Sequence, residues 1–293
     1  MSMDLYSESF GFTERPFTLS PDPDFLFWSP AHKRAFSVLE YGLVTQSPLT
    51  VVTGEVGTGK TTLIQALLRQ TDQDMTVGLV SNAQGDRGDL LRWLLNAFDV
   101  PVEQGSDYVS LFQQFQNFVL AEYAAGRHVV LIIDEAQNLG ADMLEELRML
   151  TNINSGKDEL LQIILVGQPE LRDIISQPHL RQFAQRVSTT YHLEPMDAAT
   201  TRAYIRHRLE HVGGNGTEIS LGAMSLIHEY SEGVPRMVNK MCDLALVYAV
   251  SSGRKQVSLG IIRELIKDGV ILKPQGANVF ATIRAHTSEK AAE

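Results

Sequence analysis

The hydrophobic and polar positions follow different patterns in the central and C-terminal parts of the chain. Between residues 49 and 195, short apolar β-rich runs alternate with longer amphipathic stretches, which is typical of βαβ units. The amphipathic stretches place apolar side chains at helical spacing, as Leu90, Leu94 and Phe98 do. Strands are expected at residues 49–53, 76–81, 128–133, 160–166 and 188–193. The pattern predicts an α/β fold in residues 49–195, with a three-layer αβα core around a five-stranded parallel sheet.

The segments that flank this core have other patterns. Residues 1–48 are rich in aromatic residues and repeatedly interrupted by proline, and they predict an ordered leader packed on the core. The sequence after Pro195 shows helical periods only, with Asp197, Ser220 and Ser258 as N-cap residues. Residues 196–272 are therefore expected to form a small all-helical lid domain. Residues 273–293 lose apolar periodicity and predict a flexible tail.

Composition and charge exclude several classes of protein. The 293 residues are 44% hydrophobic and 20% charged, as in an ordinary globular protein. The net charge of −10 argues against an electrostatic grip on nucleic acid along the whole chain, although it allows a local basic face. A single cysteine, Cys242, rules out an internal disulfide and a cysteine zinc site. The chain start has no export signal, and no apolar run reaches the ~20 residues that cross a bilayer, so we expect a cytoplasmic protein.

The strongest chemical motif is the run Gly-Glu-Val-Gly-Thr-Gly-Lys-Thr at residues 54–61. It matches G-x-x-x-x-G-K-[ST] and lies between a predicted strand and a predicted helix. Its glycines allow consecutive backbone N–H groups to face phosphates, Lys60 would place its charge on the β- and γ-phosphates, and Thr61 would hold a metal ion. The alternative is a glycine-rich turn with a surface lysine. The predicted nucleotide-binding residues are Gly54, Glu55, Val56, Gly57, Thr58, Gly59, Lys60, Thr61 and Thr62.

A second motif ends a predicted buried strand, where apolar residues 129–133 lead into Asp134 and Glu135. Ligands of open α/β sheets bind at such carboxyl ends of strands. Asp134 is expected to hold magnesium through its outer shell, and Glu135 to orient and polarise the attacking water. The alternative is that the two acids form a solvated cap for a helix from Asn138 onward.

These motifs resemble those of an AAA+ ATPase, and more closely those of the general secretion pathway protein A family, the ExeA-like ATPases. The resemblance covers about residues 5–270. It rests on residues 10–12, 15–17, 20–23, 25–26, 29–32, 41–42, 53–62, 134–139, 167–171, 180–186 and 233–236. It implies a P-loop core followed by a helical lid, ATP and Mg2+ as cofactors, and hydrolysis of ATP to ADP and phosphate.

The resemblance also implies roles for residues outside the two motifs. Asn82 stands where a polar switch residue bonds the catalytic acid, Gln168 where sensor 1 contacts the γ-phosphate or water, and Arg236 where sensor 2 lies. Arg186 resembles the finger arginine that completes a neighbouring subunit's site, with Arg181 as the second candidate, so a homo-oligomer is implied. A turn asparagine and ordinary surface arginines are the simpler alternatives.

Two further features have competing interpretations. Residues 29–32 resemble a segment that supplies backbone contacts to adenine, whereas the simpler interpretation is that nearby aromatic residues pin the leader to the sheet. His207 and His211 have the i, i+4 spacing of two metal ligands. The sequence has no acid at the H-E-x-x-H position and no third ligand nearby, so surface histidines are favoured.

The function implied by the resemblance is an ATPase whose nucleotide state drives assembly or remodelling of a partner in a bacterial secretion or exopolysaccharide system. Longer family members continue into a transmembrane helix and a peptidoglycan-binding module and act with a membrane partner. We therefore expect either a short relative or a truncated chain, peripheral to the inner membrane only through a partner.

Two other functions remain as alternatives. The first is a DNA-bound ATP switch of the transposition type. Its basic face would be Arg202, Arg206, Arg208, Arg236 and Lys240, although the acidic total favours a solvated helix surface. The second is a non-enzymatic nucleotide-binding scaffold, which the intact Asp134 and Glu135 disfavour.

Overall fold

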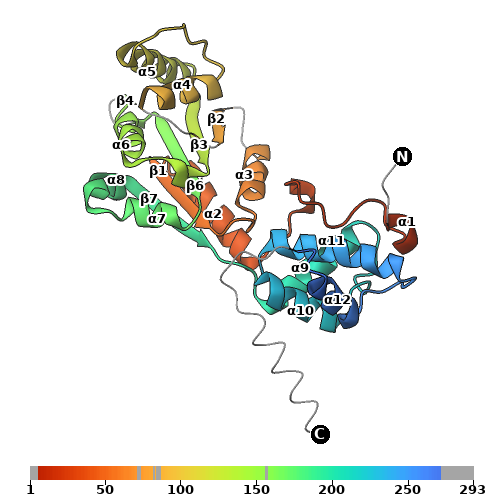
Figure 1. The fold of residues 1–293 in the computed structure, drawn as a ribbon. Helices are drawn as coiled ribbons and strands as arrows, with labels where there is room; N and C mark the ends of the chain where they lie inside the picture. The colour runs from red at the N-terminus through yellow and green to blue at the C-terminus, as the bar shows by residue number, and fades with distance from the viewer. Residues whose placement is uncertain (1–5, 71–73, 82, 84–86, 156–157, 272–293) are drawn as a thin grey trace. The chain divides into compact units, whose positions relative to one another are not determined.

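The computed structural model describes residues 6–70, 74–81, 83, 87–155 and 158–271 (Figure 1). Its contacts group the chain into two units. Residues 21–194 form the sheet unit, and residues 1–20 with 195–293 form the helical unit. The expected leader of residues 1–48 is thus divided, because its first part packs with the C-terminal helices and its second part with the sheet.

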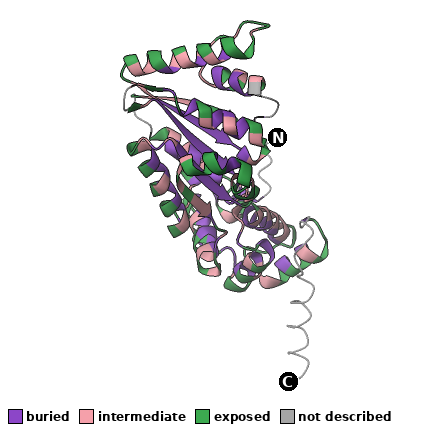
Figure 2. Cartoon of the chain, turned by 90° about the vertical axis from the view of Figure 1, so that its left-hand side faces the viewer, coloured by how far each residue is buried: buried purple, intermediate pink, exposed green. Residues whose placement is uncertain are grey.

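The sheet unit is built on five parallel strands in the order β2-β3-β6-β1-β7. They are β1 Leu49–Gly54, β2 Met75–Ser81, β3 His128–Asp134, β6 Leu161–Gly167 and β7 Val187–Leu193. Strands β1 and β6 are buried at every residue, as expected for central strands covered on both faces (Figure 2). The parallel five-stranded sheet predicted from the sequence is confirmed. The sequence pattern did not predict the short antiparallel pair of β4 Asn154–Ser155 and β5 Asp158–Glu159.

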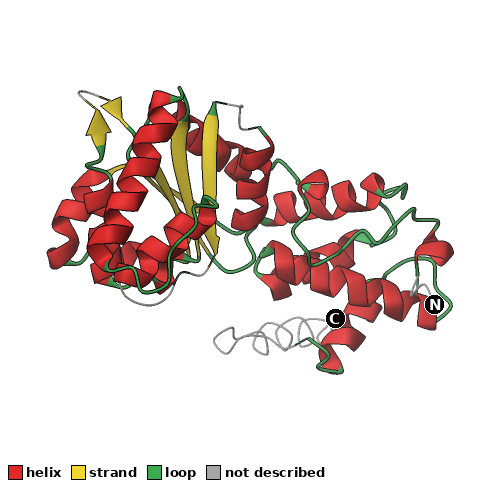
Figure 3. Cartoon of the chain, turned by 90° about the horizontal axis from the view of Figure 1, so that it is seen from above, coloured by secondary structure: helices red, strands yellow, loops and turns green. Residues whose placement is uncertain are grey.

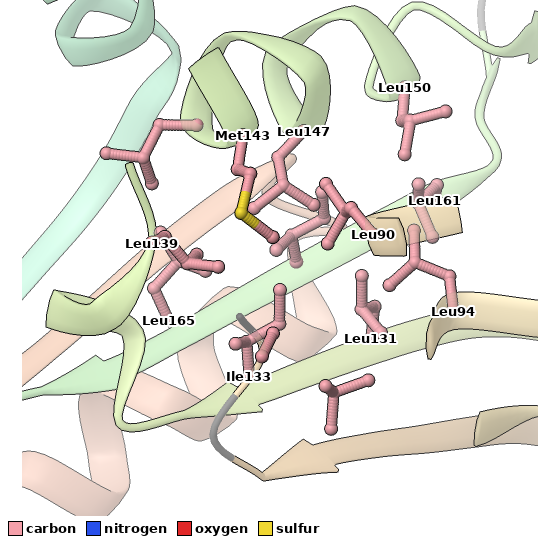
Figure 4. Close-up of a cluster of buried hydrophobic side chains, with 14 of the residues drawn as sticks. Leu90, Leu94, Leu131, Ile133, Leu139, Met143, Leu147, Leu150, Leu161 and Leu165 are labelled. Carbon is pink, nitrogen blue, oxygen red and sulfur yellow. The ribbon is translucent and has the colours of Figure 1, made fainter. Parts of the chain in front are cut away.

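Successive side chains of a strand point to opposite faces of the sheet, so each face buries every second side chain of the same strand. In β3, Val130 and Ile132 join the apolar cluster of α2 Pro30–Val44 and α3 Lys60–Arg69. Leu131 and Ile133 join the cluster of α4 Arg87–Ala97, α5 Tyr108–Ala124 and α6 Ala141–Leu150 (Figure 4). Full burial of one such side chain stabilises the fold by about 1.5–3 kcal/mol. This unit also contains the helices α7 Glu170–Ile175 and α8 Arg181–Arg186.

The described part of the helical unit contains α1 Ser7–Phe10, α9 Ala198–His211, α10 Leu221–Ser231, α11 Pro235–Ser251 and α12 Leu259–Lys267 (Figure 3). Helices α9, α10 and α12 begin at the predicted cap residues Asp197, Ser220 and Ser258, and the first two caps make a side-chain bond. The Asp197 carboxylate accepts from Thr200 N at 2.7 Å, and the Ser220 hydroxyl accepts from Ala223 N at 3.3 Å. Across the described residues, we find no helix with both the length and the apolar character that a membrane crossing requires.

Residues 6–18 are held in the helical unit by donors from α9 and α11. Arg208 Nε donates to the Pro16 carbonyl at 2.6 Å, and Asn239 Nδ2 donates to the Thr18 carbonyl at 3.0 Å. Buried backbone carbonyls need such donors, which explains why this segment accompanies the helices. Arg208 is only 5% exposed, so its predicted place on a solvent-facing or DNA-facing basic surface is wrong.

Candidate functional site

The predicted phosphate loop connects the end of β1 to the start of α3, and its glycines are required by its shape. Gly57 and Gly59 have φ of 83° and 99°, a region that other residues rarely adopt. A Cβ on Gly59 would lie 2.9 Å from His32 Nε2, and one on Gly54 would lie 2.6 Å from the Leu193 carbonyl oxygen. The loop backbone is therefore packed closely against two neighbouring segments of the sheet unit.

Lys60 lies within this loop rather than on the surface. Its side-chain Nζ donates to the Gly54 carbonyl at 2.7 Å and to the Glu55 carbonyl at 3.0 Å. The residue is 7% exposed, whereas the alternative of a surface lysine requires a solvated ammonium. The loop thus carries its positive charge at the N-terminus of α3, where the helix dipole also favours an anion.

Thr61, after β1, and Asp134, the last residue of β3, come together although they belong to different βα units. Thr61 Oγ1 donates to Asp134 Oδ2 at 2.9 Å, and Asp134 Oδ1 accepts from the backbone N–H of Glu135 at 2.9 Å. The two strands are β1 and β3, which flank β6 in the sheet, so their carboxyl ends share one edge. A hydroxyl and a carboxylate are oxygen ligands of the kind that Mg2+ prefers, and these two residues fit the predicted metal site.

The Glu135 side chain is directed by an unusual backbone. Its φ of 55° is left-handed, which is uncommon for a residue other than glycine and marks a constrained position. Its Oε2 accepts from Gln137 Nε2 at 2.6 Å and from Gln168 Nε2 at 3.1 Å. Gln168 follows β6, so the predicted catalytic acid and the predicted sensor meet in one hydrogen-bonded group. Their catalytic roles remain predictions.

His32 supports the phosphate loop from the start of α2. Its Nδ1 lies 2.8 Å from Ser29 Oγ, and its Nε2 lies 3.1 Å from the Thr58 carbonyl oxygen. A carbonyl can only accept, so Nε2 carries the proton in this contact. Burial lowers the pKa of His32, which favours the neutral ring. The adenine contacts expected of residues 29–32 remain a prediction. Of the aromatic residues in the simpler interpretation, Phe25 is buried and Trp28 is 37% exposed.

The other predicted site residues have other partners, are exposed, or lie outside the described residues. Arg186, at the end of α8, donates to Glu159 Oε1 at 3.3 Å and to Asn152 Oδ1 at 2.5 Å, whereas Arg181 is exposed. Arg236 is exposed in the first turn of α11, in the helical unit. Asn82 lies outside the described residues. The roles of these residues in nucleotide sensing and subunit contact remain predictions.

Sequence reasoning gave no role to Gln137 or to the His32 side chain. Both belong to segments on which the resemblance rests, residues 134–139 and 29–32. A polar residue two positions after a strand-end acid was the available signal for Gln137. The bonds themselves depend on tertiary contacts that the sequence pattern does not show.

Comparisons with known proteins agree with this geometry. Residues 44–175 match a family model described as an AAA domain. The chain is 38% identical over 258 residues, 88% of its length, to general secretion pathway protein A of Aeromonas hydrophila. It spans 47%, about half, of the length of that relative.

Solved structures share the fold at low sequence identity. The Aeropyrum pernix ORC2 protein, solved as ADPNP-ADP complexes, is 19% identical with a TM-score of 0.67, over 87% of this chain and 72% of that one. Cdc6p from Pyrobaculum aerophilum is 15% identical with a TM-score of 0.66, over 85% and 71% of the two chains. The Thermotoga maritima RuvB Holliday junction branch migration motor is 18% identical with a TM-score of 0.53, over 91% and 77%. Residues 44–175 therefore resemble an AAA domain, the fold is shared with these solved structures, and the chain is similar over 88% of its own length to general secretion pathway protein A.

Proposed function

We propose that this chain binds ATP with magnesium, hydrolyses it to ADP and phosphate, and uses its nucleotide state to change its own assembly or that of a partner. The observation that carries the proposal is the bond from Thr61, in the phosphate loop after β1, to Asp134 at the end of β3. The next residue, Glu135, accepts from Gln168, which follows β6, the strand between these two. The AAA domain match supports nucleotide binding. The intact pair of acids favours hydrolysis over a passive scaffold.

Each side chain has a distinct part in this reaction. The Lys60 ammonium would neutralise charge on the β- and γ-phosphates. Thr61 and Asp134 would hold magnesium, which supplies further neutralisation of the phosphate oxygens. Glu135 would accept a proton from water as the water oxygen bonds the γ-phosphorus and the bond to the β–γ bridging oxygen breaks. ADP then leaves with the electron pair, and Gln168 would contact the γ-phosphate.

The wider setting belongs to the same proposal. Similarity to general secretion pathway protein A supports action in a bacterial secretion system. The proposal extends to an exopolysaccharide system and to a place beside the inner membrane through a membrane-complex protein. Homo-oligomers would complete each site with Arg186 of the neighbouring subunit. The DNA-switch alternative is weakened, because Arg208 of its predicted basic face is buried and donates to the Pro16 carbonyl.

A paired measurement of ATP binding and turnover tests the proposal. In Glu135→Gln, a fluorescent ATP analogue should bind with nearly wild-type affinity while turnover falls about 10²- to 10⁴-fold, because an amide cannot take a proton from water. In Lys60→Ala, binding itself should be lost. Glu40→Gln, which changes an exposed carboxylate of α2, should leave both quantities unchanged.

Two results would contradict the proposal. Wild-type protein without turnover at any concentration would exclude the ATPase, and unchanged binding by Lys60→Ala would exclude the phosphate loop as the site. The same assay with and without duplex DNA separates the alternative. Stimulation by duplex, with binding that falls by a log-log salt slope of about −0.9 per neutralised phosphate, would favour the DNA switch.

A further inference from the structure

Gln137 connects the acid after β3 to the end of β6. Its Nε2 donates to Glu135 Oε2 at 2.6 Å, and its Oε1 accepts from the backbone N–H of Gln168 at 3.0 Å. Gly167 leaves the space for this contact, because a Cβ there would lie 3.0 Å from Gln137 Oε1 and 3.0 Å from Leu171 Cδ2. The Gln168 side chain donates to the same Glu135 oxygen at 3.1 Å. One carboxylate oxygen thus receives two amide donors.

The backbone N–H of Gln168 dictates the orientation of the Gln137 amide. A backbone N–H can only donate, so it must face the carbonyl oxygen of that amide, and the NH2 group then faces Glu135. The flipped amide would set donor against donor and oxygen against carboxylate. A glutamate at this position would keep the acceptor for the backbone N–H and lose the donor to Glu135. The two bonds therefore require an amide.

We propose that Gln137 is a positioning residue for ATP hydrolysis. It holds the carboxylate of Glu135 at a fixed position relative to the backbone of Gln168, which follows β6. This inference rests on the proposed function. When the Gln168 side chain turns to a γ-phosphate, it gives up its bond to Glu135, and Gln137 remains to fix the acid. Because Gln137 bonds both partners, a shift of the strand end on nucleotide binding moves the acid with it.

Gln137→Glu is the sharpest test, because it keeps the length and the acceptor, removes the donor, and places a second carboxylate beside Glu135. We expect kcat to fall about 10- to 100-fold, the scale of loss that misplacement of a reacting group by about 1 Å produces. The KM for ATP and the affinity for a fluorescent ATP analogue should stay within about 2-fold, since Gln137 acts on the chemical step. Gln177→Ala, at an exposed glutamine of the same unit, is the matched control and should change neither.

A double-mutant cycle with Gln168→Ala sharpens the assignment. Gln137→Ala and Gln168→Ala act on the same oxygen of Glu135, so their combined loss of kcat should differ from the product of the single losses. Gln137→Met replaces the alanine variant if the latter fails to fold, because it preserves the length of the side chain.

The outcomes separate this inference from the function on which it rests. Wild-type kcat in Gln137→Glu overturns the inference, and so does a raised KM with unchanged kcat, which would mark a ground-state binding role. A wild-type chain without turnover overturns the proposed function instead. Loss of kcat at unchanged affinity, absent from Gln177→Ala, supports Gln137 as the positioning residue.

Discussion

The two units use buried and half-buried polar side chains in different ways. In the sheet unit, Lys60, Thr61 and Glu135 bond to other groups of the site itself, at the edge where strands end. In the helical unit, the side chains of Arg208 and Asn239 donate hydrogen bonds to the backbone carbonyls of residues 16 and 18. Under the proposed function, the first set would exchange its partners for a nucleotide and its metal, whereas the second set fixes a segment of the chain.

Both sets of side chains meet the same physical requirement, which is that a polar group removed from water needs a hydrogen-bond partner. A buried polar group costs about 1–3 kcal/mol when it loses its partner, so both sets must be satisfied. A nucleotide and its metal can replace the bonds of Lys60 and Thr61, because phosphate and magnesium make equivalent or stronger ones. The carbonyls of Pro16 and Thr18 are bonded within the fold. Substitutions should therefore change turnover in the sheet unit and stability in the helical unit.

The largest expected effect tests whether the site of the sheet unit is complete within one chain. An arginine donated to the transition state of a neighbour contributes about 10³- to 10⁵-fold in rate, whereas a surface ion pair such as Arg186 with Glu159 contributes about 0–1 kcal/mol to stability. We expect Arg186→Ala to keep ATP binding and to lose most turnover. Arg181→Ala is the comparison, and whichever variant loses turnover identifies the finger.

Mixing of inactive variants gives the sharper readout for the same question. Arg186→Ala subunits still offer Lys60 and Glu135, and Glu135→Gln subunits still offer Arg186. Their mixture should regain activity, and wild-type activity should rise more than linearly with concentration where subunits associate. Co-assembled mixtures that stay inactive, with wild-type specific activity constant down to the monomer, would show that each chain holds a complete site.

The next effect tests whether the helical unit depends on its buried network. Arg208→Ala removes the donor to the Pro16 carbonyl and the bond to Tyr204 OH at 2.9 Å, and should cost about 2–4 kcal/mol of unfolding free energy. Arg206→Ala, on the exposed face of the same helix, should cost less than about 0.5 kcal/mol.

The chain offers separate probes for this comparison. Both tryptophans, Trp28 and Trp93, lie in the sheet unit, so their fluorescence in urea follows that unit, while far-UV circular dichroism follows both. Arg208→Ala should shift the dichroism transition and leave the fluorescence transition in place. An equal shift of both signals would mean that the two units unfold together. The variant would then lower the unfolding free energy of the whole chain, and not that of the helical unit alone.

Much of the sheet unit could be predicted because its signals are local. Strand periods, the glycine pattern at residues 54–61 and the acids after β3 each depend on a few neighbouring residues. The contact between Thr61 and Asp134 then follows, since parallel strands end at one edge of the sheet. The bonds of Gln137 could not be predicted, because they depend on the left-handed turn at Glu135 and on the register of β3 against β6.

The burial of Arg208 shows the same limit in the helical unit. Arg206 and Arg208 lie two positions apart in α9, so they point to nearly opposite sides of the helix. The helical period alone does not say which side is covered. Arg208 donates to the carbonyl of Pro16, which lies 192 positions away in the sequence, and the pattern of residues 1–48 did not indicate that contact.

The smallest effect concerns His32, a buried group of the sheet unit that holds the loop and not a ligand. Its pKa is lowered by burial, so the folded state prefers the neutral ring, while the unfolded chain titrates near the ordinary value of about 6.5. The stability that this preference supplies is complete above that value and is lost as pH falls toward the lowered folded pKa. Within that window the slope is at most about 1.4 kcal/mol per pH unit.

Urea unfolding followed by tryptophan fluorescence should therefore show a lower free energy of unfolding at pH 5 than at pH 7.5. His32→Gln keeps an N–H for the Thr58 carbonyl and cannot titrate, so it should flatten this dependence, whereas His179→Gln, at an exposed histidine of the same unit, should retain it. Equal slopes of unfolding free energy against pH in wild type and His32→Gln would show that the stability does not depend on a neutral ring at His32. His32 would then contribute no more to the pH dependence than an exposed histidine does.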